Sequence, residues 1–136
     1  MKNLFVISLL LSATVASCQL HWERGTNWKL YRYQGHRLFK IPIDSLSNYD
    51  NLVLNQDSMA VLLASVQNLH PDGPVSWMGG YIATCQLGST IRKVEISNYG
   101  GFFYDEKTRA YYQISAAKSE DWLSYIQQNY LNLTKR

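Results

Sequence analysis

Residues 75–98 read Val-Ser-Trp-Met-Gly-Gly-Tyr-Ile-Ala-Thr-Cys-Gln-Leu-Gly-Ser-Thr-Ile-Arg-Lys-Val-Glu-Ile-Ser-Asn, and this stretch decides the fold. Two predicted strands, 75–87 and 90–98, are separated by Gly88-Ser89, which is typical of a tight turn. Gly79-Gly80 indicates a bulge or bend in the first strand. The second strand alternates, with Val94 and Ile96 on one face and Lys93, Glu95 and Ser97 on the other. The stretch therefore predicts a hairpin whose second strand has an apolar and a polar face.

Shorter strands continue this hairpin in both directions along the chain. Downstream, residues 102–104 and 110–114 flank a polar loop, which extends the hairpin to a meander of four strands. Upstream, residues 28–33 alternate and are followed by a turn and by residues 37–41, which predicts a first hairpin. Pro42 ends that hairpin, because a proline nitrogen donates no hydrogen bond to a sheet.

Two helices complete the pattern. The first begins after a cap at Asn55 or Asp57, ends at the proline-rich residues 70–74, and has an apolar face made of Met59, Leu62, Leu63, Val66 and Leu69. The second has Ser119 as its cap and an inward face made of Trp122, Tyr125, Ile126 and Tyr130. The order ββαββββα predicts an α+β fold: an antiparallel sheet with two helices packed on one face.

The N-terminal 18 residues indicate export. Lys2 precedes an uncharged run from Leu4 to Leu11, which is typical of a secretory signal peptide and too short to span a bilayer. Val15-Ala16-Ser17-Cys18 then resembles the lipobox of bacterial lipoproteins. The resemblance implies cleavage before Cys18 by signal peptidase II after a diacylglycerol is attached to the Cys18 sulfur. The alternative is an ordinary signal peptide cut after Thr14-Val15-Ala16, which leaves Cys18 free.

These boundaries predict a signal peptide at 1–17, a lipidated tether at 18–27 and a single α+β domain at 28–136. The protein would lie in the bacterial cell envelope as a membrane-anchored lipoprotein. In a Gram-negative cell, the resemblance to lipoproteins implies the outer membrane over the inner one, because Gln19 stands where those proteins carry the aspartate associated with inner-membrane retention. A soluble secreted or periplasmic protein is the alternative. Only Cys18 and Cys85 are present, so no disulfide framework is predicted, although an unlipidated Cys18 leaves a bridge to Cys85 open.

Charge is segregated along the chain, although the net charge is only +3. Residues 24–40 contain basic but no acidic side chains, and residues 41–91 contain acidic but no Lys or Arg side chains. A basic patch of Lys29, Arg32, Arg37 and Lys40 is a candidate site for polyanions or lipid head groups. The alternatives are a solvated outer face of the sheet and neutralisation of the two halves by each other in the fold. Nucleic acid is not expected as a partner.

Catalytic motifs are absent from the sequence. It has no Gly-x-Ser-x-Gly elbow, no His-Glu-x-x-His and no glycine-rich phosphate loop. Cys85 lies in mid-strand, where a cysteine is usually a small core residue. The three histidines, His21, His36 and His70, are too scattered to suggest a metal site. We therefore expect no enzyme, no cofactor and no metal.

Aromatic residues make up 13% of the chain and gather on the predicted strands. Because side chains alternate along a strand, Phe102 and Phe103 must face opposite ways, as must Tyr111 and Tyr112. Some of these rings therefore meet solvent or a partner, unless loops or the N-terminal hairpin cover that face. The candidates for partner binding are Trp77, Tyr81, Tyr99, Phe102, Tyr104 and Tyr112. The predicted function is a lipid-anchored envelope protein, of an inhibitor or immunity type, that captures a protein partner. The alternatives are an assembly accessory of the envelope and, less favoured, a small hydrolase.

Overall fold

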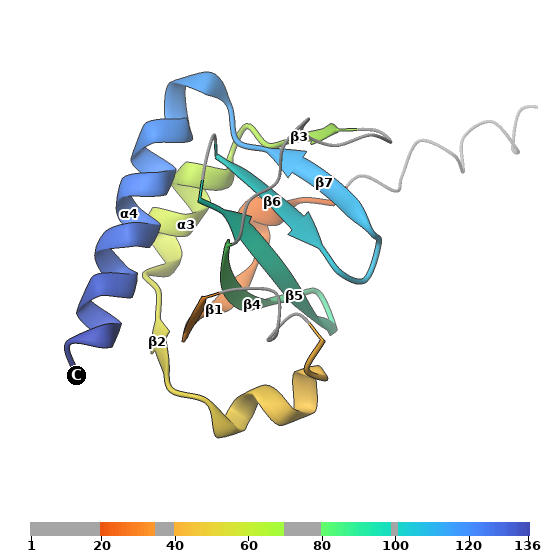
Figure 1. Cartoon of the computed structure of the whole chain (residues 1–136). Helices are drawn as coiled ribbons and strands as arrows, with labels where there is room; N and C mark the ends of the chain where they lie inside the picture. Colours follow the sequence, from red (N-terminus) through yellow and green to blue (C-terminus); the bar gives the residue numbers. More distant parts are fainter. Residues whose placement is uncertain (1–19, 35–39, 70–79, 99–100) are drawn as a thin grey trace, which may run out of the picture.

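The computed structural model describes residues 20–34, 40–69, 80–98 and 101–136. Its centre is a seven-stranded antiparallel sheet in the order β2-β1-β4-β5-β6-β7-β3 (Figure 1). The strands are β1 (Thr26–Gln34), β2 (Asn51–Val53), β3 (Gln67–Leu69), β4 (Gly80–Leu87), β5 (Thr90–Ser97), β6 (Phe102–Asp105) and β7 (Ala110–Gln113). The helices are α3 (Gln56–Leu63) and α4 (Ala116–Thr134), with short 3₁₀ helices η2 (Trp22–Arg24) and η3 (Ile43–Asn48). The predicted α+β class is confirmed.

The meander β4-β5-β6-β7 forms the middle of the sheet, as the hairpin at 75–98 predicted. β4 pairs with β5 without interruption from Gly80 opposite Ser97 to Leu87 opposite Thr90. Gly88 in the connecting turn has a φ of +64°, which a residue with a side chain seldom adopts. The expected irregularity at Gly79-Gly80 does not interrupt this ladder, which begins at Gly80, and Gly79 lies outside the described residues.

One face of the sheet carries the main core. This core face presents Leu30, Ala83, Val94, Phe103 and Tyr112 from neighbouring strands, and α3 and α4 cover it (Figure 1). Met59, Leu62 and Leu63 of α3 and Trp122 and Ile126 of α4 are buried against it. Phe103 and Phe102 face opposite ways, as do Tyr112 and Tyr111, in agreement with the strand alternation. Packing of both helices on one face is thus confirmed.

A bulge in β1 sets which of its side chains enter the core. Thr26 lies opposite Gln86 and Lys29 opposite Thr84, so β1 has one extra residue between these pairs. Asn27 takes up the extra length with a φ of +52°, a conformation that asparagine tolerates better than most residues. After the bulge, Trp28 and Leu30 are buried on the core face, while Lys29 is exposed on the other face.

Three local predictions about the elements are wrong. β1 does not form the expected hairpin with residues 37–41: it pairs with β2 and β4, residues 40–41 are not a strand, and residues 35–39 lie outside the described residues. The first helix ends at Leu63, and Gln67–Leu69 form β3 on the edge beside β7. The last helix begins at Ala116 after Ser115, so Ser119 is not its cap. The order is therefore ββαβββββα, with one strand more than predicted.

The N-terminal boundary of the domain also differs from the prediction. Trp22 is 1% exposed, and its ring makes edge-on contacts with Phe103 and Tyr112, with centroid distances of 5.0 and 5.2 Å. Leu20 packs against the same core, and β1 begins at Thr26. Residues 20–27 therefore belong to the folded domain and not to the expected tether. The physical reason is that one large indole ring is enough to bind this polar segment to the core.

Arg92 of β5 and Asp105 of β6 form a buried ion pair on the core face. The Asp105 side chain is fully buried, and its Oδ2 accepts hydrogen bonds from Arg92 Nη1 at 2.7 Å and from Thr108 Oγ1 at 2.6 Å. The Thr108 backbone N–H donates to the same oxygen at 3.3 Å. Asp105 thus holds the β6-β7 loop and compensates the charge of Arg92, whose side chain is 10% exposed.

Candidate functional site

The other face of the sheet, here called the outer face, has three distinct parts. It presents Tyr31, Ile82, Lys93, Glu95 and Tyr104. At one end, η3 and residues 40–43 lie over it, and Tyr31, Leu46 and Ile82 form a small buried cluster with Ile41 packed on it. Next to η3 are two hollows, and on β6 and β7 is a row of aromatic rings. Lys93, Glu95 and Ser97 of β5 lie on this face, opposite Val94 and Ile96 as the alternation predicted, and all three are buried.

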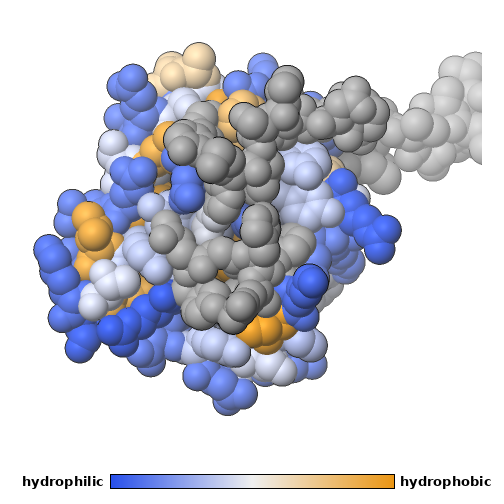
Figure 2. All heavy atoms as spheres, in the orientation of Figure 1, coloured by the Kyte–Doolittle hydropathy of each residue, from blue (hydrophilic) through white to orange (hydrophobic). Residues whose placement is uncertain are grey.

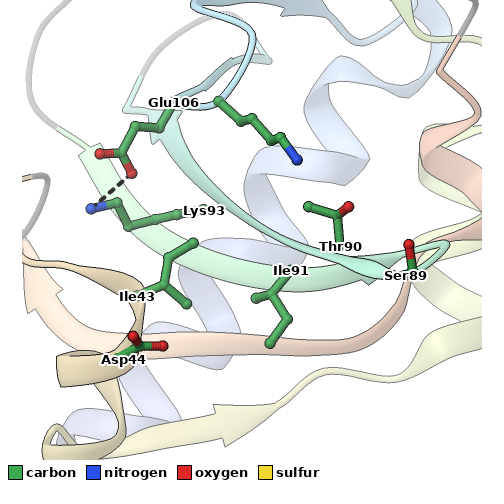
Figure 3. A pocket seen from close by; sticks show the side chains of 8 residues that line it. Ile43, Asp44, Ser89, Thr90, Ile91, Lys93 and Glu106 are labelled. Atoms are coloured by element: carbon green, nitrogen blue, oxygen red, sulfur yellow. Dashed lines mark ion pairs between the residues drawn. The ribbon is translucent and has the colours of Figure 1, made fainter.

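The first hollow, the Lys93 hollow, has a volume of about 750 Å³ and is widely open to solvent. Figure 3 shows Ile43 and Asp44 entering it from η3 and Lys93 pointing toward Glu106. Lys93 Nζ lies 2.9 Å from Glu106 Oε2 and donates to the Ile41 carbonyl at 2.6 Å. The Lys93 side chain is only 1% exposed, so its main effect is to fasten residues 40–43 to β5.

The second hollow, the Lys29 hollow, lies on the other side of Ile43, Asp44 and Ile91, which line both hollows. It has a volume of about 580 Å³ and is more enclosed. At its floor the hydroxyls of Tyr31 and Thr84 share a hydrogen bond of 3.3 Å. The remaining lining comes from β1, η3, β2 and β4 and consists of Cys85 and five polar residues: Asn27, Lys29, Ser47, Asn51 and Gln86.

The aromatic row, here called the aromatic strip, consists of Phe102, Tyr104 and Tyr111. All three are half-buried on the outer face, and the rings of Tyr104 and Tyr111 have centroids 4.8 Å apart. Burial raises the pKa of the Tyr104 hydroxyl, and the neighbouring Tyr111 raises it further. The strip therefore places three flat aromatic rings on a pair of hydrogen-bonded strands, which suits contact with a partner.

Two of the predicted partner-binding residues prove to be core residues. Tyr81 is 7% exposed and Tyr112 is 5% exposed, because both lie on the core face, where Tyr81 contacts Tyr130 of α4 and Tyr112 stacks on Phe103. Phe102 and Tyr104 remain as candidates on the outer face. Trp77 and Tyr99 lie outside the described residues, as does Cys18. Tyr111, which was not among the candidates, joins the strip as the direct cross-strand partner of Tyr104.

The described members of the predicted basic patch are Lys29, Arg32 and Lys40, all of them exposed. Lys29 is on the outer face, whereas Arg32 pairs with Asp50 at 3.0 Å and also donates to the Thr134 carbonyl at the end of α4. The Arg32–Asp50 pair is one contact between the basic and acidic parts of the sequence. Lys40 is exposed, and Arg37 lies outside the described residues.

Cys85 is a buried core residue on β4. Its side chain is 1% exposed. The pKa of the Cys85 thiol is raised to about 12, mainly by burial and in addition by Asp105, while Arg92 lowers it. A thiol with this pKa is not a nucleophile at neutral pH. Among the described residues, no three His, Cys, Asp or Glu side chains are grouped to hold a metal ion.

The view in Figure 2 shows a mostly hydrophilic surface on which hydrophobic residues form small, separate patches. Within the described part of the chain, no helix has the length and apolar character needed to cross a membrane. Comparisons with protein-family models, with curated proteins and with solved structures gave no match.

Proposed function

We propose that this protein is a lipid-anchored protein of the bacterial cell envelope that captures a protein partner through the aromatic strip. The observation that carries the proposal is the arrangement of Phe102, Tyr104 and Tyr111 on two paired strands of the outer face. Tyrosine combines a large apolar ring with a hydroxyl group, and such rings are frequent among the residues that dominate binding energy. Their strands are fixed by the core behind them, so little ordering is required on binding.

The surroundings of the strip also favour a binding role. The Lys93 hollow is widely open to solvent, and the charged groups that line it include an ion pair between Lys93 and Glu106. Enzyme sites usually bring several polar groups together in a deep, mostly apolar pocket, and their titratable groups have shifted pKa values. The pKa of the Cys85 thiol is strongly raised by burial in the core, which suits a packing role.

The anchor rests on the sequence Val15-Ala16-Ser17-Cys18, which resembles a lipobox. A lipid with two or more chains holds a small domain stably at a membrane, whereas one chain gives only marginal binding. The test is the intact mass of the full chain extracted from membranes. We expect a mature N-terminus at Cys18 with an added diacylglycerol and loss of membrane association in Cys18→Ser. A mature protein with unmodified Cys18 would refute the anchor.

Partner capture is tested with the full chain carrying Cys18→Ser, used as bait against envelope and secreted fractions. We expect one protein in stoichiometric amount and a loss of affinity of about 30-fold or more in Tyr104→Ala with Tyr111→Ala, the effect of losing a strong contact residue. Tyr49→Ala is the matched control, since Tyr49 is an exposed tyrosine outside the strip. Both variants must keep the circular dichroism spectrum of the parent.

Two outcomes would contradict this proposal. Capture that is equally strong in the strip variant and in the control would place the contact elsewhere on the molecule. Absence of any protein above the level of an unrelated bait would remove protein capture as the function.

A further inference from the structure

The Lys29 hollow has the features of a site for a small polar ligand, separate from the aromatic strip. The β1 bulge lies at its rim, and Asn27, the residue with φ of +52°, lines it. Bulges and strained residues are concentrated near binding sites, where they redirect side chains. Here the extra residue allows Trp28 to enter the core while Asn27 and Lys29 both line the hollow.

Two charged groups in the hollow, Lys29 and Asp44, have no side-chain partner among the described residues. Lys29 comes from the sheet and Asp44 from η3, and neither side chain has an ion pair or a hydrogen bond to any other residue within the described ranges. An ammonium group donates hydrogen bonds and a carboxylate accepts them. The two walls therefore offer one strong donor and one strong acceptor to a ligand between them.

The other polar groups act as both donor and acceptor. Side-chain amides come from Asn27, Asn51 and Gln86, and hydroxyls come from Ser47, Thr84 and Tyr31. Ile43 and Ile91 add an apolar edge, and Ile91 is 52% exposed. A ligand that matches this lining has many hydroxyl groups, each a donor and an acceptor, together with apolar C–H surface.

Charge and size restrict the ligand class further. The charges of Lys29 and Asp44 cancel, so the hollow does not favour a phosphate or another anion, whose sites use several N–H donors or Arg and Lys groups. Its volume of about 580 Å³ lies within the range of small-molecule sites. Neutral amide and hydroxyl side chains outnumber the two charged ones, which favours a neutral ligand over a zwitterionic amino acid.

We propose that the Lys29 hollow binds a neutral saccharide, with Lys29 donating to and Asp44 accepting from its hydroxyl groups. Asn27, Asn51 and Gln86 form the remaining hydrogen bonds, and Ile43 and Ile91 contact its C–H face. This site is independent of protein capture by the aromatic strip.

The experiment uses the full chain in a detergent without a sugar head group. Cellobiose, maltose and N,N′-diacetylchitobiose are titrated separately and followed by calorimetry and saturation-transfer NMR. We expect saturable binding of at least one disaccharide. Lys29→Met and Asp44→Asn should each weaken this binding about tenfold or more, the effect of losing a hydrogen bond to a charged group. Lys107→Met is the matched control, because Lys107 lines the neighbouring Lys93 hollow and not the Lys29 hollow, and it should leave the affinity unchanged.

Three results would overturn this inference. The first is no saturable binding of any of the three disaccharides at concentrations up to 50 mM, about a thousandfold above a typical protein concentration in such a titration. The second is disaccharide binding that Lys107→Met weakens as much as Lys29→Met does. The third is binding of free glutamine, dependent on Lys29 and Asp44, without binding of the disaccharides, which would assign the hollow to an amino acid. Tyr104 does not line the Lys29 hollow, so Tyr104→Ala tests partner capture without altering the saccharide site. Failure of saccharide binding can therefore be distinguished from failure of partner capture.

Discussion

Removal of the Asp105 carboxylate tests how strongly this domain depends on one buried charge. Asp105→Ala removes three hydrogen bonds to one oxygen, from Arg92 Nη1 and from the hydroxyl and backbone N–H of Thr108. It also leaves the Arg92 guanidinium without its ion-pair partner in a position where the side chain is 10% exposed. Breaking a buried ion pair in this way costs about 3–5 kcal/mol, a large part of the 5–15 kcal/mol that stabilises a typical domain.

The cost should depend on Arg92 being present, and a double-mutant cycle measures this dependence. We expect Asp105→Leu combined with Arg92→Met to lose about 1.5–3 kcal/mol less than the sum of the two single substitutions, because the double variant buries no unpaired charge. The free energy of unfolding is measured by urea denaturation at pH 7, followed by circular dichroism.

The exposed pair Arg32–Asp50 provides the matched control for this cycle. Its two side chains are 45% and 71% exposed, so Arg32→Met and Asp50→Ala should couple by no more than about 1 kcal/mol. If the Arg92 and Asp105 substitutions were additive within about 0.5 kcal/mol, the buried pair would not be stabilising the domain as a unit.

Two further predictions concern a turn and a thiol. Gly101→Ala should destabilise the domain more than Gly88→Ala. Both glycines have a positive φ, which costs an alanine about 1–2 kcal/mol. At Gly101 the added Cβ would also overlap the Ser119 side chain, whereas at Gly88 it would meet open space. Equal losses in thermal unfolding would contradict this steric reasoning. In a Cys18→Ser background, Cys85 should react with Ellman's reagent at pH 8 only through unfolding, since the native thiol has a pKa of about 12. The thiol of the unfolded chain ionises near its ordinary pKa of 9.0, whereas the native thiol stays protonated until about pH 12. The free energy of unfolding should therefore fall between about pH 9 and pH 12, and it should fall less steeply in Cys85→Ala.

The local sequence was sufficient to predict the central strands and the face of the sheet on which their side chains lie. The alternation around Val94 and Ile96 predicted the core face of β5, and the Gly88-Ser89 turn predicted the pairing of β4 with β5. Asn55 caps α3 as expected, its side chain accepting from the Ser58 N–H at 2.9 Å. These features depend on residues close together in the chain.

Alternation could not show what covers the outer face. Lys93 is buried because its ammonium group donates to the carbonyl of Ile41, which is 52 positions away in the sequence. Likewise, the apolar spacing that continues to Val66 and Leu69 fits a helix, yet the helix ends at Leu63 and Leu69 pairs with Tyr111 in β3. A short apolar segment can form either a helix or a strand, and its contacts with the rest of the fold decide which one forms.

The Lys29 hollow was even less accessible to sequence reasoning. Asp44 and Lys29 belong to separate segments, and the bulge that places Asn27 at the rim has no distinct sequence signature. The only sequence signal for this region was Lys29 itself, interpreted as part of a basic patch. The best available signal for the packed N-terminal segment was Trp22, a large aromatic residue in a segment that was otherwise polar.

If Cys18 is lipidated as we propose, the position of Trp22 limits how far from the membrane the domain can lie. Four residues of chain lead from Cys18 to Trp22, and a fully extended chain covers at most about 3.6 Å per residue. With Cys18 lipidated, as we propose, Trp22 would lie within roughly 15 Å of the anchored cysteine, about half the thickness of the bilayer's hydrocarbon layer. The domain would rest on the lipid head groups, unable to reach across the envelope, and would meet only partners that come to the same membrane surface.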